Sequence, residues 1–232
     1  MCLFPCLLYV SMSSCGQKIH YIPIPKTGSE STKNMLGSFA CWKRPGTHKM
    51  NLGLHKIEHV WMNSTVIRIA TFRDPVERFV STYTALRNSK LTRSDQDYIP
   101  LISKDINSLV NNFTAMKLLM NGMGSGHFIP IFKFLLTKNC LTSHFIVNFT
   151  YINEFTHLVT DVFETNLTLK RVNDPIPGLH NYYKSEYVSF HIKKYYREDF
   201  LLHRKLHTIC DHSYHHILVC KPQCNILPEK LY

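Results

Sequence analysis

Three short stretches of the chain carry the hydrophobic pattern of buried β-strands. Residues 65–72 form a β-branched run with polar residues on both sides, and residues 144–149 form a second apolar run. A third stretch, residues 18–25, has apolar side chains at Ile19, Tyr21, Ile22 and Ile24. Short runs rich in branched and aromatic residues are typical of strands that lie inside a sheet.

The segments between these stretches carry the spacing of amphipathic helices. The clearest helix start is Asp74, a capping residue, followed by Pro75, which suits the first helical position, and Glu77, which completes a capping box. Apolar residues then recur at helical spacing, at Val76, Phe79, Val80 and Tyr83. We predict further helices over residues 30–39, 105–121, 151–163 and 185–205.

The alternation of strands and helices predicts an α/β fold, with a central parallel sheet flanked by helices. The chain has 232 residues and is 44% hydrophobic, which is enough for one domain with a real core and too short to argue for two. We assign this domain to residues 18–232 and interpret residues 1–17 as an apolar remnant, either a degenerate signal or part of an anchor. In α/β folds, ligands bind at the carboxyl ends of the strands.

The first polar motif in such a position runs from Pro25 to Thr32, between a predicted strand and a predicted helix. Gly28 allows a tight turn, and the N–H groups at the helix start can form a cradle for an anion. The side chains that can add to this cradle are Lys26, Thr27, Ser29, Ser31 and Thr32. The motif makes the domain P-loop-like, but it is not a Walker A loop, because its lysine precedes its only glycine. The alternative is a polar turn with a helix cap rich in serine and threonine.

The second polar motif, residues 73–81, follows the predicted strand 65–72. Arg73 leaves the end of this strand, while Arg78 and Ser81 lie three positions apart and share a helix face. The three side chains can close on one phosphate, because the arginine fork makes bidentate contacts. The alternative is a capped amphipathic helix with surface arginines.

Together, the two motifs resemble the cofactor-binding elements of sulfotransferases, which use 3′-phosphoadenosine 5′-phosphosulfate. The first motif resembles the loop that holds the 5′-phosphosulfate, and the second resembles the R-x-P-x-x-R-x-x-S element that holds the 3′-phosphate. The resemblance is strongest to the Golgi carbohydrate sulfotransferases, which include the chondroitin 4-O, heparan 2-O and uronyl 2-O enzymes. Residues 126–130, 144–155 and 195–200 are similar to later segments of that family, so the likeness covers about residues 18–202.

The resemblance implies roles for individual residues and requires no metal. Lys26 is expected to neutralise the oxygen of the leaving nucleotide, and Arg73 and Ser81 are expected to hold the 3′-phosphate. We expect the base that takes the proton of the acceptor hydroxyl to be His55, ahead of His59, because a histidine pKa near neutrality suits this task. His127 and Glu58 are the other candidates.

The net charge of +11 favours an anionic partner. We expect an anionic glycan, a glycosaminoglycan, as the acceptor and no nucleic acid, because the basic residues are scattered and form no long Lys/Arg block. The main alternative is a catalytically inactive lumenal glycan-binding protein of the same fold, since Glu30 in the first motif would repel an anionic cofactor unless it points away. A P-loop nucleotide kinase is disfavoured by the missing Walker lysine.

The eight cysteines are even in number and contain no CxxC pair. In an oxidising lumen they are expected to form disulfides. The most favoured pairings lie within Cys210, Cys220 and Cys224, with Cys41 and Cys140 as further partners. The alternative is a zinc site in the same tail that also includes His212, His215 and His216, although the spacing fits no common zinc knuckle.

Four N-x-Thr sequons also favour a lumenal chain, at Asn63, Asn112, Asn148 and Asn166. Two of these, Asn112 and Asn148, lie inside apolar stretches, so we expect one or both to be buried and unmodified. The apolar run over residues 3–12 is too short to span a membrane and has no basic region before it. Either the chain is secreted by a degenerate signal, or a membrane anchor is missing from this sequence. The expected location is the Golgi lumen, in association with the membrane, with secretion as the alternative.

Overall fold

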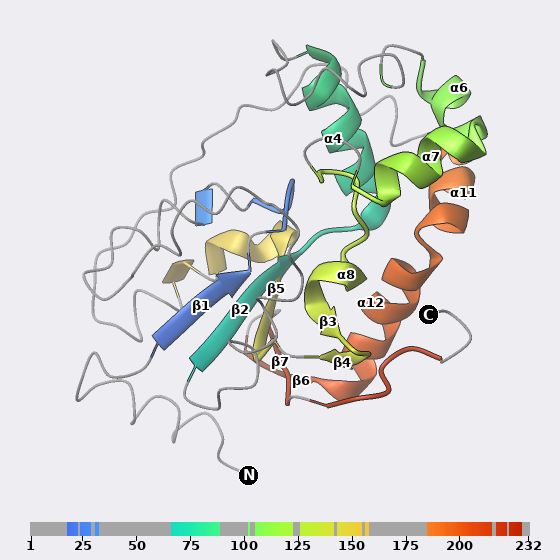
Figure 1. The fold of residues 1–232 in the computed structure, drawn as a ribbon. Helices are drawn as coiled ribbons and strands as arrows, with labels where there is room; N and C mark the ends of the chain where they lie inside the picture. Colours follow the sequence, from blue (N-terminus) through green and yellow to red (C-terminus); the bar gives the residue numbers. More distant parts are fainter. Residues whose placement is uncertain are drawn as a thin grey trace.

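The fold is taken from a computed structural model, shown in Figure 1. The residues that it describes are 18–22, 24–28, 31–32, 66–88, 102, 105–122, 126–141, 143–154, 156–157, 185–214, 217–221 and 223–228.

A five-stranded sheet lies at the centre of the described fold (Figure 1). Its strands are, in spatial order, β1 (Lys18–Ile22), β2 (Val66–Phe72), β5 (Phe145–Asn148), β7 (Ile217–Val219) and β6 (Asp211–Tyr214). The first three strands are parallel to one another, with β2 between β1 and β5. The predicted parallel α/β sheet is therefore confirmed, and the carboxyl ends of β1 and β2 lie at one edge of it.

The other side of the sheet is antiparallel, a feature that was not predicted from the sequence. β7 pairs antiparallel with β5, and β6 pairs antiparallel with β7. Residues 211–214 read DHSY, which has none of the alternating apolar pattern of a strand, and the apolar run of β7 is only three residues long. Pairing with the rest of the sheet, rather than local preference, makes these residues strands.

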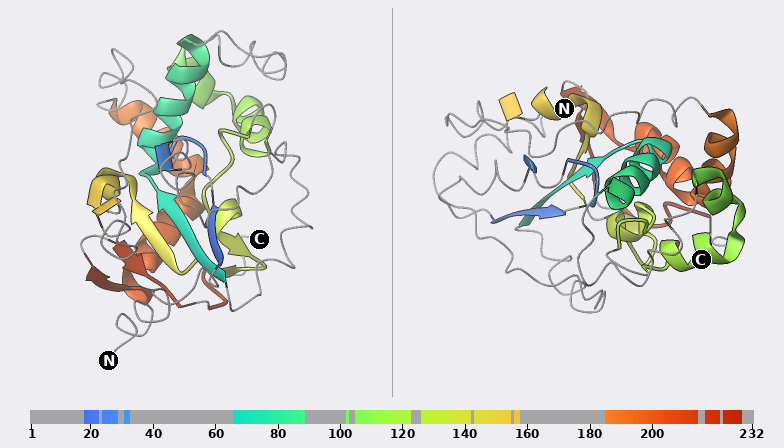
Figure 2. Two further views of the ribbon diagram at one scale, coloured as in Figure 1. Left: turned by 90° about the vertical axis from the view of Figure 1, so that its left-hand side faces the viewer. Right: turned by 90° about the horizontal axis from the view of Figure 1, so that it is seen from above.

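The helices of the described fold pack mainly against one another and against one side of the sheet (Figures 1 and 2). The longest, α4 (Pro75–Asn88), continues directly from β2, and its first turn is capped by the Asp74 carboxylate, which accepts from the backbone N–H groups of Val76 and Glu77. This confirms the predicted helix start. A short helix, α8 (Phe132–Leu135), leads into a two-stranded hairpin of β3 (Leu136–Thr137) and β4 (Cys140–Leu141), and a single 3-10 turn, η2 (Phe149–Tyr151), follows β5.

Two of the predicted helices are each broken into two. Residues 105–121 form α6 (Ile106–Asn111) and α7 (Phe113–Met120), because Asn112 takes an extended conformation and its side chain caps α7 by accepting from the Ala115 N–H. Residues 185–205 lie in α11 (Glu186–Tyr195) and α12 (Arg197–Ile209), with the break at Tyr196. Apolar periodicity continues through both breaks, which is why it could not locate them.

The two sequons that the structure describes are half-buried rather than fully buried. Asn112 is the cap of α7, and the Asn148 side chain accepts from the Thr150 N–H at 3.0 Å. Of the other predicted helices, residues 30–39 are described only at Ser31 and Thr32, which are helical, and residues 151–163 only in part. Within the described part of the chain, no helix is both long enough and apolar enough to cross a membrane.

The buried side chains of the described residues form two clusters. One fills the space between the sheet and α12, where Ala70, Phe72 and Ile146 from the strands meet Leu202 and Leu206. The other joins α4, α6, α7 and α11, and its members include Phe79, Tyr83, Leu109, Met116 and Ile192. α4 belongs to the second cluster while its preceding strand belongs to the first, so the segment between them, residues 73–74, lies where the two halves of the core meet.

Among the described residues, two disulfides connect the carboxyl-terminal part of the chain to the core. Cys210, at the end of α12, is bonded to Cys220, which follows β7, and Cys140 in β4 is bonded to Cys224. The Cys210–Cys220 bond lies within the predicted group. Cys224 instead pairs with Cys140, which was predicted only as a further partner. Cys41 lies outside the described residues. The predicted alternative, a zinc site in this tail, is wrong for Cys210, Cys220 and Cys224, because all three are oxidised.

We predict that the two disulfides contribute unequally to stability. In the chain-entropy view, a bond that closes a longer loop removes more entropy from the unfolded state, so the Cys140–Cys224 bond, with a separation of 84 residues, should contribute more than Cys210–Cys220, with a separation of 10. The expected losses in the free energy of unfolding are roughly 4–5 and roughly 2–3 kcal/mol, measured by urea unfolding of the two double Cys→Ala variants. Peptide mapping without reduction checks the pairing itself; crossed pairs, or equal losses, would contradict the prediction.

Candidate functional site

The first predicted motif forms a tight turn directly after β1. Lys26 and Gly28 both have positive φ angles, 63° and 79°, and the Thr32 N–H donates to the Gly28 carbonyl at 3.0 Å as the helix begins. A Cβ atom at Gly28 would lie 2.7 Å from the ring of Phe149 in η2. The backbone conformation and the close approach of this ring both require glycine at this position.

Buried hydroxyl groups connect the turn to the sheet. The Thr27 side chain is fully buried, and its hydroxyl lies 2.6 Å from that of Thr71 in β2, which in turn lies 2.8 Å from the Tyr21 hydroxyl in β1. The Thr32 hydroxyl is also used internally, donating to the Gly28 carbonyl. Two of the hydroxyls that the sequence assigned to an anion therefore fix the shape of the turn.

Lys26 and Ser31 are partly exposed, and in the described part of the first motif they are the two polar side chains that can reach a ligand. Ser29 and Glu30 lie outside the described residues. The predicted bases, His55 and His59, also lie outside them, as does Glu58.

Arg73 brings the two motifs together, although they lie 47 positions apart in the sequence. Its Nη1 atom donates to the Lys26 carbonyl at 3.2 Å, and its guanidinium carbon lies 4.7 Å from the centre of the Phe149 ring. Phe149 therefore contacts both motifs, because the same ring closes over Gly28. Phe149 was not predicted as a site residue; its only signal in the sequence is its place at the end of a predicted strand.

Arg73 is also paired with an acidic side chain. Its Nε atom lies 3.3 Å from the Oε2 atom of Glu77, whose side chain is 47% exposed. Ser81 lies one helical turn beyond Glu77 and shares its face of α4. Among the described residues, the Ser81 hydroxyl has no hydrogen-bond partner. Arg73, Glu77 and Ser81 follow one another at intervals of four residues, so Glu77 lies between the other two side chains.

Arg78 points the other way, into the protein. Its side chain is 1% exposed, and it donates to the carbonyl oxygens of Pro25, His127 and Ile129. Burial lowers the pKa of this guanidinium, and the nearby Asp199 opposes that shift. Because arginine stays protonated in proteins, the result is a buried cation that is satisfied by backbone carbonyls of the first motif and of the segment at residues 126–132.

Two side chains near the start of α12 bind the same segment. The Tyr196 hydroxyl donates to the Phe128 carbonyl at 2.6 Å, and the Asp199 carboxylate accepts from the N–H groups of Ile131 and Phe132 at 2.9 and 2.8 Å. With Arg78, they fix most of the backbone groups between His127 and Phe132. His127, a candidate base, therefore contributes its carbonyl oxygen to this network.

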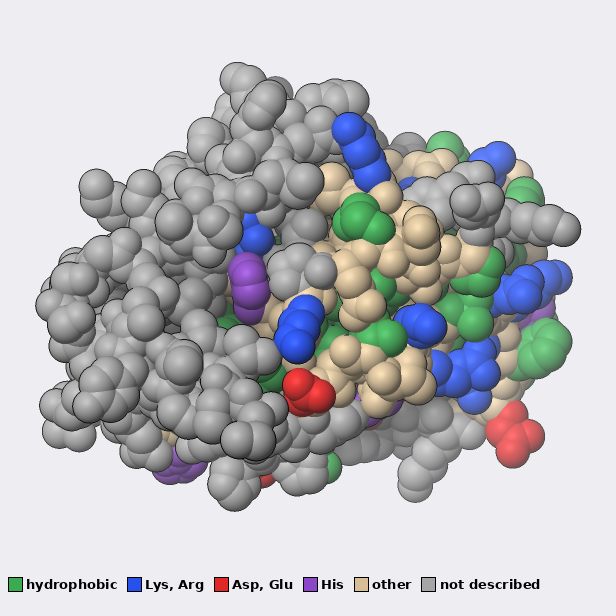
Figure 3. All heavy atoms as spheres, turned by 90° about the horizontal axis from the view of Figure 1, so that it is seen from below, with side chains coloured by type: hydrophobic (Ala, Val, Ile, Leu, Met, Phe, Trp, Pro, Cys, Tyr) green, Lys and Arg blue, Asp and Glu red, His purple; other side chains and the backbone are tan. Residues whose placement is uncertain are grey.

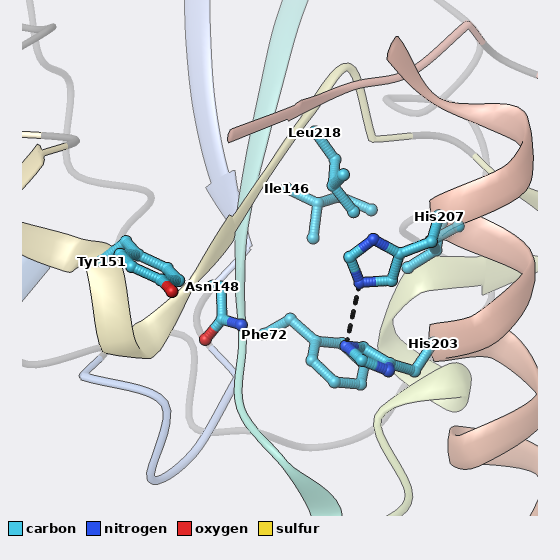
Figure 4. Close-up of a pocket in the computed structure, with 8 residues that line it drawn as sticks. Phe72, Ile146, Asn148, Tyr151, His203, His207 and Leu218 are labelled. Atoms are coloured by element: carbon cyan, nitrogen blue, oxygen red, sulfur yellow. Dashed lines mark hydrogen bonds between the residues drawn. The ribbon is translucent and has the colours of Figure 1, made fainter. Parts of the chain in front are cut away.

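A small hollow lies on the α12 side of β2 and β5 at their carboxyl ends (Figure 4). Its volume is about 70 Å³, and its polar lining residues are Asn148, Tyr151, His203 and His207. The His203 ring stacks on Phe72 with 4.8 Å between the ring centres. Burial lowers the pKa of His203, as does the neighbouring His207, while Asp74 acts in the opposite direction.

Compared with known protein families, residues 13–204 match the sulfotransferase family. No curated protein and no solved structure gives a significant match. The matched residues include both motifs, the segment at residues 126–132 and the buried side chains that hold them.

The position of Asp199 leads to a prediction about pH. Burial raises the pKa of Asp199 to about 6, against the opposing effects of Arg78 and of the two N–H donors. Because an unfolded aspartate has a pKa of about 3.9, the protonated carboxyl favours folding, and this contribution is lost as the pH rises through about 6. Relative to Asp199→Asn, the wild type should gain roughly 1–3 kcal/mol of unfolding free energy between pH 7 and pH 4.

The measurement is urea unfolding at several pH values. Glu198→Gln provides the matched control, since it removes the adjacent carboxylate, which is only half-buried, and should leave most of the pH slope of the wild type in place. The Asp199→Asn variant is expected to be less stable than the wild type at every pH, because the new amide group faces two N–H donors, so the slope and not the absolute stability is decisive. Parallel slopes for the wild type and Asp199→Asn would contradict the prediction.

Proposed function

Because the chain belongs to the sulfotransferase family, we propose that it transfers a sulfuryl group from 3′-phosphoadenosine 5′-phosphosulfate to a hydroxyl of a glycan, with a glycosaminoglycan as acceptor. The observation that carries this proposal is the contact between the two motifs at the carboxyl ends of β1 and β2, where Arg73 donates to the Lys26 carbonyl. A single P-loop-like domain over residues 18–232 would hold the nucleotide at this edge, as is usual for ligands of α/β sheets.

The side chains of the two motifs have different parts in this proposal. Lys26 and the N–H groups at the start of the following helix face the phosphosulfate, and Arg73 and Ser81 hold the 3′-phosphate. Thr27, Thr32 and Arg78 shape the site from inside, because their polar groups are engaged with the protein. Glu77 has to leave Arg73 when a phosphate arrives, and its exposure allows it to turn into solvent.

The transfer itself needs an attacking oxygen, a base and a stabilised leaving group. The acceptor oxygen bonds to sulfur as the bond between sulfur and the phosphate oxygen breaks, and the hydroxyl proton passes to the base. Lys26 offsets the negative charge that develops on the departing phosphate oxygen. His55 is the proposed base, with His59 next, and this assignment is made from the sequence.

The acceptor class is inferred from charge. The chain carries a net charge of +11, and Figure 3 shows basic side chains spread over the described part of one face with few acidic ones among them. A polyanionic glycan is attracted to such a surface. The two disulfides support an oxidising compartment, and we propose the Golgi lumen, with membrane association, and secretion as the alternative.

A glycan-binding protein without catalysis is the second candidate, favoured by Glu77 on Arg73 and by Glu30 in the first motif. The two candidates are separated by one pair of measurements. An enzyme binds 3′-phosphoadenosine 5′-phosphate and moves radiolabelled sulfate to at least one member of a panel of chondroitin, dermatan and heparan acceptors. A binding protein retains the glycan but does neither.

We predict that Arg73→Ala and Ser81→Ala weaken binding of 3′-phosphoadenosine 5′-phosphate. Loss of a charge-assisted contact costs about 1.5–3 kcal/mol, which corresponds to roughly ten- to a hundredfold in Kd by calorimetry; the effect of Ser81→Ala should fall at or below the lower end. Arg204→Ala, an exposed arginine on α12, is the matched control and should bind as the wild type does. Arg78→Lys should instead lower the thermal unfolding temperature, because it leaves buried carbonyls without a donor. Unchanged binding in both test variants would place the 3′-phosphate elsewhere.

We further predict that His55→Ala reduces turnover by roughly 10²–10⁴-fold while nucleotide binding is retained. Wild-type turnover should fall below about pH 6.5, because a protonated imidazole cannot accept a proton. A carboxylate base such as Glu58 would move this acid limb toward about pH 4–5. Variants at His55, His59, Glu58 and His127, compared in one transfer assay, identify the base. Near wild-type turnover of His55→Ala would refute the first choice, and full activity of all four would place the base elsewhere.

A further inference from the structure

Two histidines on α12 have no role in the proposed sulfuryl transfer. His203 and His207 are four positions apart, so they lie on one face of the helix, and their Nε2 atoms are 3.3 Å apart. The rings are nearly perpendicular, at 81°, with 4.7 Å between their centres (Figure 4). At this spacing the two nitrogens share one proton, or both direct a lone pair at a third atom between them.

The distance between the two nitrogens fits a metal ion. Zinc binds imidazole nitrogen at about 2.0–2.1 Å in tetrahedral geometry, which places two such nitrogens about 3.3–3.4 Å apart. The pair already has this separation without any change in side-chain position. A pair of histidines at i and i+4 on a helix is also the arrangement that helical metal sites use for two of their ligands.

The surroundings hold the pair in place. His203 is stacked on Phe72 at an interplanar angle of 23°, and between the two histidines the buried Leu206 anchors the same turn of α12 to the sheet. Cys210, the residue that follows α12, is tied to Cys220 by a disulfide. Little side-chain entropy therefore remains to be lost when a ligand joins the two rings.

The hollow beside the pair leaves room for the other ligands of an ion. Its volume is about 70 Å³, and a water needs about 10–15 Å³ of such space. Figure 4 shows Asn148 and Tyr151 across the hollow from the two histidines. Within the described residues, no group of three or more histidine, cysteine or acidic side chains is placed to hold a metal, so water or an external ligand would fill the remaining positions.

We propose that His203 and His207 form a binding site for a divalent transition-metal ion of the zinc class, with both Nε2 atoms as ligands. When the ion binds, the proton shared by the two Nε2 atoms moves to an Nδ1 atom, so each ring remains neutral and presents a lone pair to the metal. The site does not depend on the proposed sulfuryl transfer.

The test is calorimetric titration of the full chain, purified without a histidine tag, with Zn²⁺, Cu²⁺ and Mg²⁺. The wild type should bind one equivalent of Zn²⁺ more tightly than any remaining sites, Cu²⁺ should bind more tightly than Zn²⁺, and Mg²⁺ should not bind. His207→Ala is the main variant, because the His207 side chain is exposed and its loss should leave the fold intact. The variant should weaken Zn²⁺ binding at least roughly tenfold, as should His203→Ala.

His191→Ala is the matched control, since it removes a histidine from the neighbouring helix α11 that contacts Tyr187 and Phe190 rather than a second histidine. It should bind Zn²⁺ as the wild type does. Zn²⁺ should also raise the unfolding temperature of the wild type and of His191→Ala, but not that of His207→Ala. Equal Zn²⁺ binding by His207→Ala and the wild type, or an equal loss in His191→Ala, would overturn the proposal. Both readouts are independent of nucleotide binding and of sulfate transfer.

Discussion

The burial of one cation, Arg78, is the constraint on which the described site depends. A charged group without water has to be surrounded by acceptors, and here those acceptors are backbone carbonyls from two separate segments, at Pro25 and at residues 127 and 129. The first turn and the segment at residues 126–132 are therefore held at fixed distances from α4. Pro25 and residues 127–129 belong to no helix or strand, so the hydrogen bonds of the Arg78 guanidinium hold them in position.

The other buried polar groups of the 126–132 segment also need hydrogen-bond partners. Tyr196 and Asp199 satisfy the next carbonyl and the next two N–H groups of the 126–132 segment, which leaves most of this buried stretch of irregular backbone hydrogen-bonded. The break between α11 and α12 falls at Tyr196, where the chain changes direction and brings both side chains to this segment. The candidate site is thus supported by polar contacts from Tyr196 and Asp199, which lie 67–68 positions further along the chain than the backbone groups that they bind.

The sequence predicted the parts of this structure that local pattern determines. The parallel strands, the capped start of α4 and the turn at Gly28 each have a short-range signal, and all three are present. The sequence alone could not distinguish polar side chains on the surface of the site from those that point into the protein. Thr27 and Arg78 were therefore predicted to bind the cofactor, just as Lys26 and Arg73 were. Other features depend on contacts between distant segments, and no local pattern encodes them. These are the β6–β7 pairing, the packing of the Phe149 ring against Gly28 and the disulfide between Cys140 and Cys224.

The pairing of Glu77 with Arg73 changes what it means for an anion to bind at this surface. Because the guanidinium already has a carboxylate partner, an incoming anion does not gain a new ion pair but exchanges with one that exists. The free energy of such an exchange is the difference between two similar contacts, plus the gain from releasing Glu77 into water. A doubly charged anion would compete better with the resident carboxylate than a singly charged one would, so the Arg73–Glu77 pair would bias this surface toward dianions.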